Sequence, residues 1–157
     1  WVTYNHIVPC RLLAASYGQM LITKRVEFSA SHACRNPLLS DRENQELFGP
    51  AANPHGHGHN YAIEVTVEGE PDVVTGMVID LKKLKDVINR QVIELYDHRF
   101  LNYEVQPFDR VVPTPENIAI DIWGRLQPQL AGAGSRLHAV RVYETADLYV
   151  DYFGEPA

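Results

Sequence analysis

The amino-acid sequence predicts an α+β protein built around an antiparallel sheet. Apolar and polar residues alternate over residues 20–32 and 58–69, which is the period of a half-buried strand. Two helical stripes follow, over residues 81–95 and from residue 115 onward, and two more strands close the chain. Because neighbouring strands follow one another without a long helix between them, we expect antiparallel pairing rather than a doubly wound parallel sheet.

The first strand, Met20–His32, should turn His32 toward the face that points to the core. Residues 33–56 hold three prolines and several polar residues, which indicates a long loop. One short helical turn is expected inside this loop, over Ser40–Phe48. A serine at its start and Glu43 three residues later form a capping box.

Two helices are expected in the second half of the chain. Asp80 is a suitable N-cap for the first, whose apolar stripe covers residues 81–95. Thr114 caps the second, and Pro115 takes its first position, where a missing N–H costs nothing. This second helix should end near Gln127–Pro128 or slightly beyond.

Three further strands are expected around these helices. A short strand at Met77–Ile79 precedes the first helix. After the flexible segment AGAGS, the strands Leu137–Glu144 and Leu148–Phe153 should form a hairpin around Thr145–Asp147.

The composition limits the classes of function. The chain has 157 residues, 45% of them hydrophobic, which suits one soluble globular domain. A net charge of −6 without a long basic run argues against nucleic-acid binding, and no apolar run approaches the roughly 20 residues that span a bilayer. The only cysteines, Cys10 and Cys34, form no CxxC pair, so a cytoplasmic location is expected. Residues 1–19 lack the features of a secretory signal, and we expect a poorly ordered extension before a domain at 20–157.

The stretch NPHGHGHNY sets three histidines at alternate positions and predicts a metal site. Residues i and i+2 of an extended chain project to one face, so His57 and His59 can reach one ion. His32 is the best third candidate because it ends a strand expected to be a sheet neighbour. Three imidazoles with an open fourth position are typical of catalytic zinc. On spacing alone His55 can replace one of them, and a His-Gly-rich surface turn is the simpler alternative.

Two carboxylates are further candidates. Asp97 precedes His98, but adjacent residues of an extended segment point to opposite faces, so a relay needs a turn or a second subunit. Alternatively, this histidine interacts with a helix dipole. Glu144 ends a predicted strand, where it can accept two hydrogen bonds from the guanidine-like edge of a 2-aminopyrimidinone. A solvated hairpin residue is the alternative for Glu144.

Several motifs occur in order from about Lys24 to Phe153: FSASH, LFG, NPHGHGHNY, VTVEGEPDVVTGMVIDLKKLK, DHRFLN, TPENIAIDIW and VRVYETAD. Together they resemble the 6-pyruvoyl-tetrahydropterin synthase family, including its 6-carboxytetrahydropterin synthase branch. The resemblance implies a tunnel fold (T-fold), in which an antiparallel four-stranded sheet carries two helices on one face. It further implies trimeric barrels that pair into homohexamers.

The resemblance also implies roles for individual residues. The zinc ligands would be three histidines, His32, His57 and His59. Asp97 and His98 would belong to the proton-transfer machinery. Glu144 would anchor the pterin ring, helped by backbone groups near Thr114 and Glu116. The implied substrate is 7,8-dihydroneopterin triphosphate, which gives a pyruvoyl product by loss of triphosphate or a carboxy product by carbon–carbon cleavage.

The sequence departs from the family pattern at one position. The family's catalytic cysteine follows the FG motif by a few residues, and in LFGPAANPHGHGH this position is Ala51. An alanine cannot transfer a proton. The candidates for a replacement are Cys34, Glu43, Glu46 and His55, and the sequence does not choose among them. Two hypotheses follow: a zinc-dependent lyase, or a pterin-binding T-fold protein with lost or altered catalysis.

Overall fold

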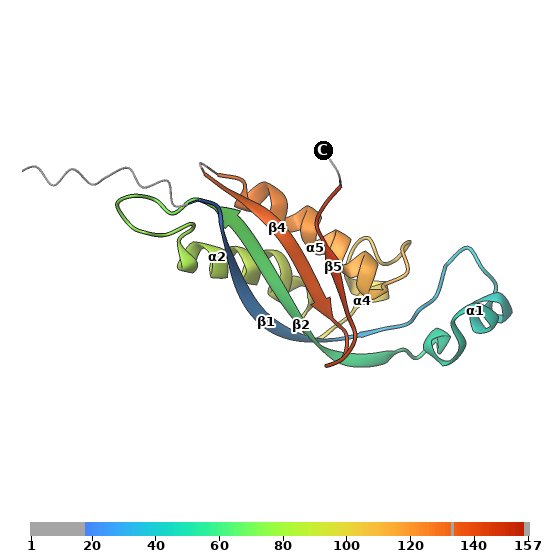
Figure 1. The fold of residues 1–157 in the computed structure, drawn as a ribbon. Helices are drawn as coiled ribbons and strands as arrows, with labels where there is room; N and C mark the ends of the chain where they lie inside the picture. The colour runs from blue at the N-terminus through green and yellow to red at the C-terminus, as the bar shows by residue number, and fades with distance from the viewer. Residues whose placement is uncertain (1–17, 133, 156–157) are drawn as a thin grey trace, which may run out of the picture.

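The computed structural model describes residues 18–132 and 134–155 (Figure 1). One five-stranded sheet, in the order β3-β1-β2-β4-β5, forms its centre. The strands are β1 Met20–His32, β2 His57–Gly69, β3 Arg99–Phe100, β4 Ser135–Tyr143 and β5 Tyr149–Tyr152. Antiparallel ladders join β1, β2, β4 and β5, whereas the two residues of β3 run parallel to β1.

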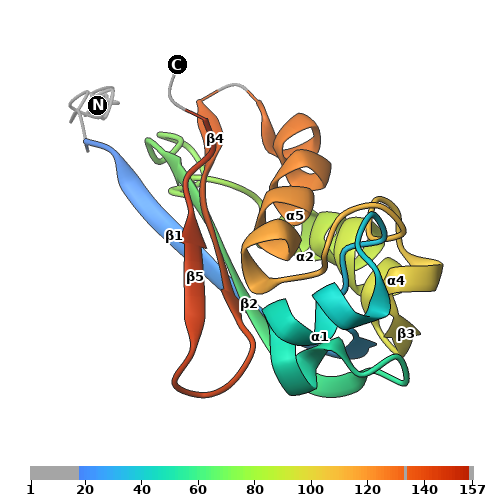
Figure 2. The same cartoon turned by 90° about the vertical axis from the view of Figure 1, so that its right-hand side faces the viewer.

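Two long helical segments cover one face of this sheet. The helices are α1 Asp41–Phe48, the 3₁₀ turn η1 Gly49–Ala52, α2 Leu81–Ile88, the π-helical turn η2 Asn89–Ile93, α3 Glu94–Tyr96, α4 Leu101–Glu104 and α5 Pro115–Leu130. The segments α2, η2 and α3 follow one another without a gap, so they form the helix predicted over residues 81–95. Figure 2 shows α2 and α5 side by side against the same face of the sheet.

The core lies between that face and the two helices, and it explains where His32 lies. In β1 the buried residues are Phe28, Ala30 and His32, every second position, as the alternation predicts. Phe28 is paired across the ladder with Tyr61 of β2, and both rings are buried. His32 therefore continues the buried row to the end of the sheet, where the apolar core gives way to polar side chains.

The caps form as the sequence predicts. Ser40 and Glu43 make the reciprocal capping box of α1, and the Asp80 carboxylate accepts from the first N–H groups of α2. Thr114 caps α5, which begins at Pro115 and runs two residues past Pro128. Helix starts are the best-predicted boundaries in the chain because side-chain chemistry defines them locally.

Two predicted features of the sheet differ. The strand expected at Met77–Ile79 does not form, and a turn at residues 73–75 precedes it. In this turn Asp72 accepts hydrogen bonds from the N–H of Val74 and from both the N–H and the hydroxyl of Thr75. These local bonds satisfy the backbone without a neighbouring strand. The four-stranded antiparallel prediction also missed β3, which is too short to show any alternation.

The predicted extension over residues 1–19 lies outside the described residues except for its last two positions. Within the described part of the chain, no helix is long and apolar enough to cross a membrane.

Candidate functional site

Three histidines meet where β1 and β2 leave the core. The ladder pairs His32 with His57 and Ala30 with His59, so the three rings converge on one face of the two strands. Their ligand atoms all lie within 4.8 Å of one another. Gly56 lies immediately before His57, where a side chain would meet the His32 carbonyl and the Phe100 ring. The strands β1 and β2 can therefore approach each other closely at this point.

Burial favours the neutral form of His32 and His59. The pKa of His32 is lowered from 6.5 to about 4, mainly by burial and to a smaller extent by His57 and His59. Burial likewise lowers the pKa of His59. A carbonyl can only accept, so the 2.6 Å contact between His32 Nδ1 and the Pro113 oxygen places the proton on Nδ1. The Nε2 atom of His32 therefore presents a lone pair.

That lone pair faces a carboxylate. Glu144 Oε1 lies 3.4 Å from His32 Nε2 and 3.7 Å from His59 Nε2. Among the described residues, both nitrogens are buried without a hydrogen-bond partner. Lone pairs and a negative charge that face one another without an intervening donor are unfavourable, and a cation between them removes the conflict. The donor set and its geometry fit a divalent metal ion bound through imidazole nitrogens.

A second pair of polar side chains forms at the edge of β1. His98 has a φ of 59°, a left-handed conformation that turns its ring back toward Asp97. Its Nδ1 lies 2.9 Å from Asp97 Oδ2, while Asp97 Oδ1 accepts the Ser29 N–H at 2.9 Å. The Ser29 N–H, followed by His98, holds the pKa of Asp97 below its usual value. Adjacent Asp and His side chains can meet through a turn or a second subunit. In the structure Asp97 and His98 lie in a turn.

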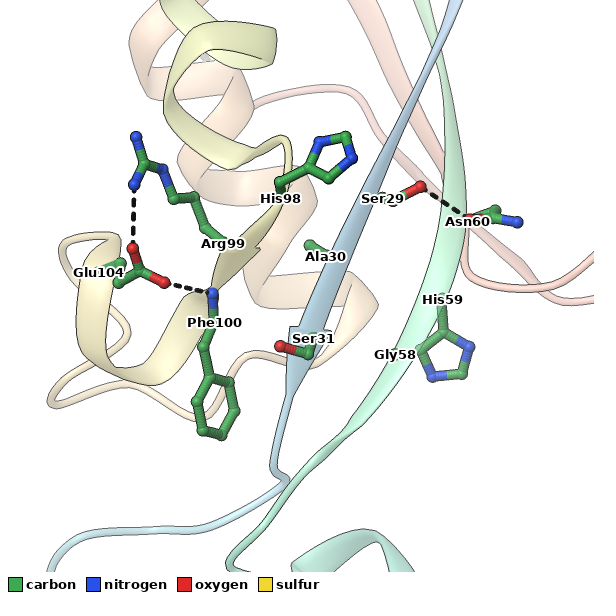
Figure 3. Close-up of a pocket in the computed structure, with 10 residues that line it drawn as sticks. All are labelled: Ser29, Ala30, Ser31, Gly58, His59, Asn60, His98, Arg99, Phe100 and Glu104. Carbon is green, nitrogen blue, oxygen red and sulfur yellow. Dashed lines mark hydrogen bonds and ion pairs between the residues drawn. The ribbon is translucent and has the colours of Figure 1, made fainter.

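An open pocket of about 540 Å³ is lined by one histidine from each of these groups (Figure 3). His98 lines it on the side of β3, and His59 lines it on β2. Ser29, Ser31 and Asn60 from the outer face of the strands line the space between them. In Figure 3 the two imidazole rings do not point toward each other. The side chain of His98 is 82% exposed.

Comparison with known proteins identifies the family. A family model described as 6-pyruvoyl tetrahydropterin synthase matches residues 21–155. The human 6-pyruvoyl tetrahydrobiopterin synthase is 45% identical over 137 residues, which cover 87% of this chain and 93% of the human protein. This chain belongs to the 6-pyruvoyl tetrahydropterin synthase family. The resemblance found in the sequence motifs is thereby confirmed.

Other members of the 6-pyruvoyl tetrahydropterin synthase family agree in fold but differ in name. The structure of the Caenorhabditis elegans synthase is 36% identical, has a TM-score of 0.84 and covers 89% of this chain and 99% of that one. The predicted T-fold is therefore confirmed. A dihydroneopterin monophosphate aldolase from Pyrococcus furiosus is 39% identical over 111 residues, covering 71% of this chain and 78% of the aldolase. Family membership supports a lyase of pterin biosynthesis without choosing its product.

The two further candidates predicted from the family pattern lie in the first turn of α5. The Thr114 hydroxyl accepts the Asn117 N–H at 3.4 Å, so this side chain is occupied as the helix cap. Glu116 is exposed, and its charge acts on the Cys34 thiol. Since Pro113 bonds to His32, the start of this helix is fixed against the histidine cluster.

The structure separates the four candidates for the group missing at Ala51. The Cys34 N–H donates to the Ala51 carbonyl at 2.8 Å, so these positions are neighbours. Burial raises the pKa of the Cys34 thiol, and the charges of Glu144 and Glu116 raise it further. The other three are engaged or exposed elsewhere: Glu43 caps α1, Glu46 pairs with Arg42, and His55 lies on an exposed turn.

Sequence reasoning missed two residues of the site. The amide of Asn102 bonds to both the N–H and the carbonyl of Ala33, at 2.8 and 2.9 Å, and so fixes the chain between His32 and Cys34. Asn102 belongs to the DHRFLN motif, but nothing local indicates its partner. Tyr61 is the other, and its ring contacts His32 and His59. The alternation along β2 predicts only that this side chain lies in the core.

Proposed function

We propose that this chain is a zinc-dependent lyase that acts on 7,8-dihydroneopterin triphosphate or a close relative, in pterin or 7-deazapurine biosynthesis. The observation that supports it is the cluster of three imidazoles with Glu144 against it. A site of this kind offers three nitrogen ligands and leaves a coordination position for a substrate.

Each group in the site has a separate task in this proposal. Three histidines would hold the zinc ion: His32, His57 and His59. When bound, zinc supplies Lewis acidity toward the oxygens of the pterin side chain. Glu144 accepts hydrogen bonds from the 2-amino edge of the pterin, and the backbone at Thr114–Glu116 lies beside that ring. Glu144 Oε1 lies 3.4 Å from His32 Nε2, so the proposed pterin-binding carboxylate adjoins the histidine cluster.

Asp97 and His98 move protons in this proposal. The Asp97 carboxylate keeps a proton on Nδ1 of His98, which leaves Nε2 to accept or donate one. Asp97 is itself fixed by the Ser29 N–H, so the dyad keeps its orientation before substrate arrives. We further propose that Cys34 supplies the thiol that Ala51 lacks, since it is the candidate nearest to that position.

The chain is proposed to act as a cytoplasmic homohexamer. The pairing with β3 covers only Ala30 and Ser31 of β1, and the part of β1 before them pairs on one side alone within the described residues. A free strand edge of this length is a natural surface for pairing with another copy. The partner proposed is therefore the chain itself, together with its pterin substrate.

Incubation of the zinc-loaded protein with 7,8-dihydroneopterin triphosphate tests this proposal, with products identified by mass spectrometry. A pyruvoyl, carboxy or hydroxymethyl pterin supports a lyase and selects its branch. Cys34→Ala should lower kcat by 10²-fold or more, on the order of the contribution of a positioned proton-transfer group. Full activity in that variant would exclude Cys34 from the chemistry.

The second hypothesis is a pterin-binding protein with lost or altered catalysis, and Ala51 is the observation that favours it. It predicts tight pterin binding without turnover by the natural sequence. Restoration of the thiol in Ala51→Cys would then create activity. Turnover by the unmodified chain contradicts this alternative.

A further inference from the structure

Tyr61 carries a hydroxyl that the fold buries and leaves without a partner. The residue is 0% exposed, and its hydroxyl is one of three buried side-chain atoms in the described chain that lack a hydrogen bond. The other two are the Nε2 atoms of His32 and His59, which the metal site accounts for. A buried hydroxyl without a hydrogen-bond partner is destabilising, so its presence requires an explanation.

The surroundings of the ring prevent the hydroxyl from finding a partner by rotation. Tyr61 stacks on Phe28 with ring centroids 5.2 Å apart. It meets His59 at 5.5 Å and His32 at 6.0 Å, both edge to face. The ring is therefore fixed between the apolar core and the histidine cluster. A phenol keeps its proton at neutral pH, so the hydroxyl remains a donor.

A second buried tyrosine shows how this fold satisfies a phenol when the role is structural. Tyr96 is also 0% exposed and packs on Phe28 from another side. Its hydroxyl donates to the carboxylate of Asp121, which Arg125 also binds. The two tyrosines thus share the same core, and of the two only Tyr61, whose ring contacts His32 and His59, has a hydroxyl without a partner.

We propose that Tyr61 is a substrate-binding residue, whose hydroxyl donates a hydrogen bond to an acceptor atom of a pterin that Glu144 holds beside the histidine cluster. This inference rests on the proposed function, because it assumes that a pterin occupies the site. The acceptor is an oxygen or an unprotonated ring nitrogen, since a protonated phenol has one hydrogen to give. Glu144 accepts hydrogen bonds from donor groups of the pterin, and Tyr61 donates one to an acceptor atom. The two residues therefore recognise different groups of the same ligand.

The test compares Tyr61→Phe with Tyr96→Phe in the zinc-loaded full chain. Each variant removes one buried hydroxyl and keeps the ring. We measure the Kd of neopterin by calorimetry, zinc per chain by atomic absorption, and the melting temperature without ligand. For Tyr61→Phe we expect unchanged zinc content, an equal or higher melting temperature, and a Kd raised about tenfold. For Tyr96→Phe we expect a lower melting temperature and an unchanged Kd.

Several outcomes overturn the inference. Equal neopterin affinity in Tyr61→Phe and the natural chain would refute it while leaving the proposed function intact. A destabilised Tyr61→Phe with normal affinity would assign the hydroxyl to a buried water, and loss of zinc would assign it to the metal site. If the natural chain binds no neopterin at all, both the proposed pterin function and this inference are wrong.

Discussion

The three histidines of the HGHGH stretch occupy different environments although the motif repeats them. His57 belongs to the convergent cluster, whereas His55 lies on an exposed turn two residues earlier. His57→Ala should therefore reduce bound zinc from about one ion per chain to a small fraction, because two imidazoles hold zinc weakly. His55→Ala is the matched control and should retain zinc. Equal zinc content in both variants, measured by atomic absorption after dialysis, would contradict the ligand assignment.

The buried His32 gives the metal-free protein a defined pH dependence. Its pKa is about 4 in the folded chain and 6.5 without the fold, so the unfolded chain binds the proton more readily. The stability is complete above pH 6.5 and is lost as the pH falls toward about 4. The loss amounts to at most about 3 kcal/mol. Urea unfolding across this interval measures it.

The control for this pH effect is His32→Asn, which removes the titrating ring. Its free energy of unfolding should depend less on pH in the same interval, even though the variant is less stable at pH 7. Parallel pH profiles for the two proteins would show that other groups dominate acid unfolding.

At this scale, strand parity predicted that His32 faces the core and that His57 and His59 share a face. Other features depend on contacts that no sequence pattern contains. The hydrogen bond from His32 to Pro113 joins residues far apart in the chain, and no local signal indicates the left-handed φ of His98. The Asp97–His98 geometry therefore could not be predicted locally.

Between β1 and β2, one glycine controls how closely the elements approach. Gly56 has a φ of 70°, and a Cβ there would lie 2.8 Å from the His32 carbonyl and 2.9 Å from the Phe100 ring. Gly56→Ala should lower stability by about 2–4 kcal/mol, from backbone strain plus the clash, and should weaken zinc binding. Thermal unfolding and zinc titration measure the two effects.

Gly76 provides the matched control, because it has the same φ of 70° but nothing within 4 Å of its Cβ position. Gly76→Ala should show only the backbone penalty, about 1–2 kcal/mol, with unchanged zinc affinity. The difference between the two variants then measures the contact with His32 and Phe100. Identical behaviour would mean that the close approach has no influence on the metal site.

Helices with a capping residue and strands with a long alternation of apolar and polar residues were predicted well. Strands that exist only through pairing with a neighbouring strand were not. The capping box of α1 and the threonine cap of α5 are local chemistry and can be predicted from a few residues. The two-residue strand β3 exists only because β1 lies beside it. No strand forms at Met77–Ile79, because Asp72 gives the backbone just before it local hydrogen-bond partners that its strand-like composition does not reveal.

The assembled molecule is proposed to form each site from more than one subunit. The exposure of His98 supports this, because its ring does not point toward the histidine cluster of its own chain. Co-refolding the inactive variants His57→Ala and His98→Ala should then restore activity of up to about a quarter, from interfaces at which both contributing subunits are intact. Each variant refolded alone should stay inactive. No recovery in the mixture would mean that a single chain supplies the complete site.

The hydrogen bond between Cys34 and Ala51 has a consequence for how such enzymes are recognised. Cys34 and Ala51 are well separated in the sequence but are neighbours in the fold. A reactive group can therefore migrate from one to the other during evolution while it stays nearly fixed in space. A sequence motif that requires the cysteine at one fixed position would classify this chain as an inactive homologue. A comparison of residue positions in three dimensions would retain it among candidate enzymes.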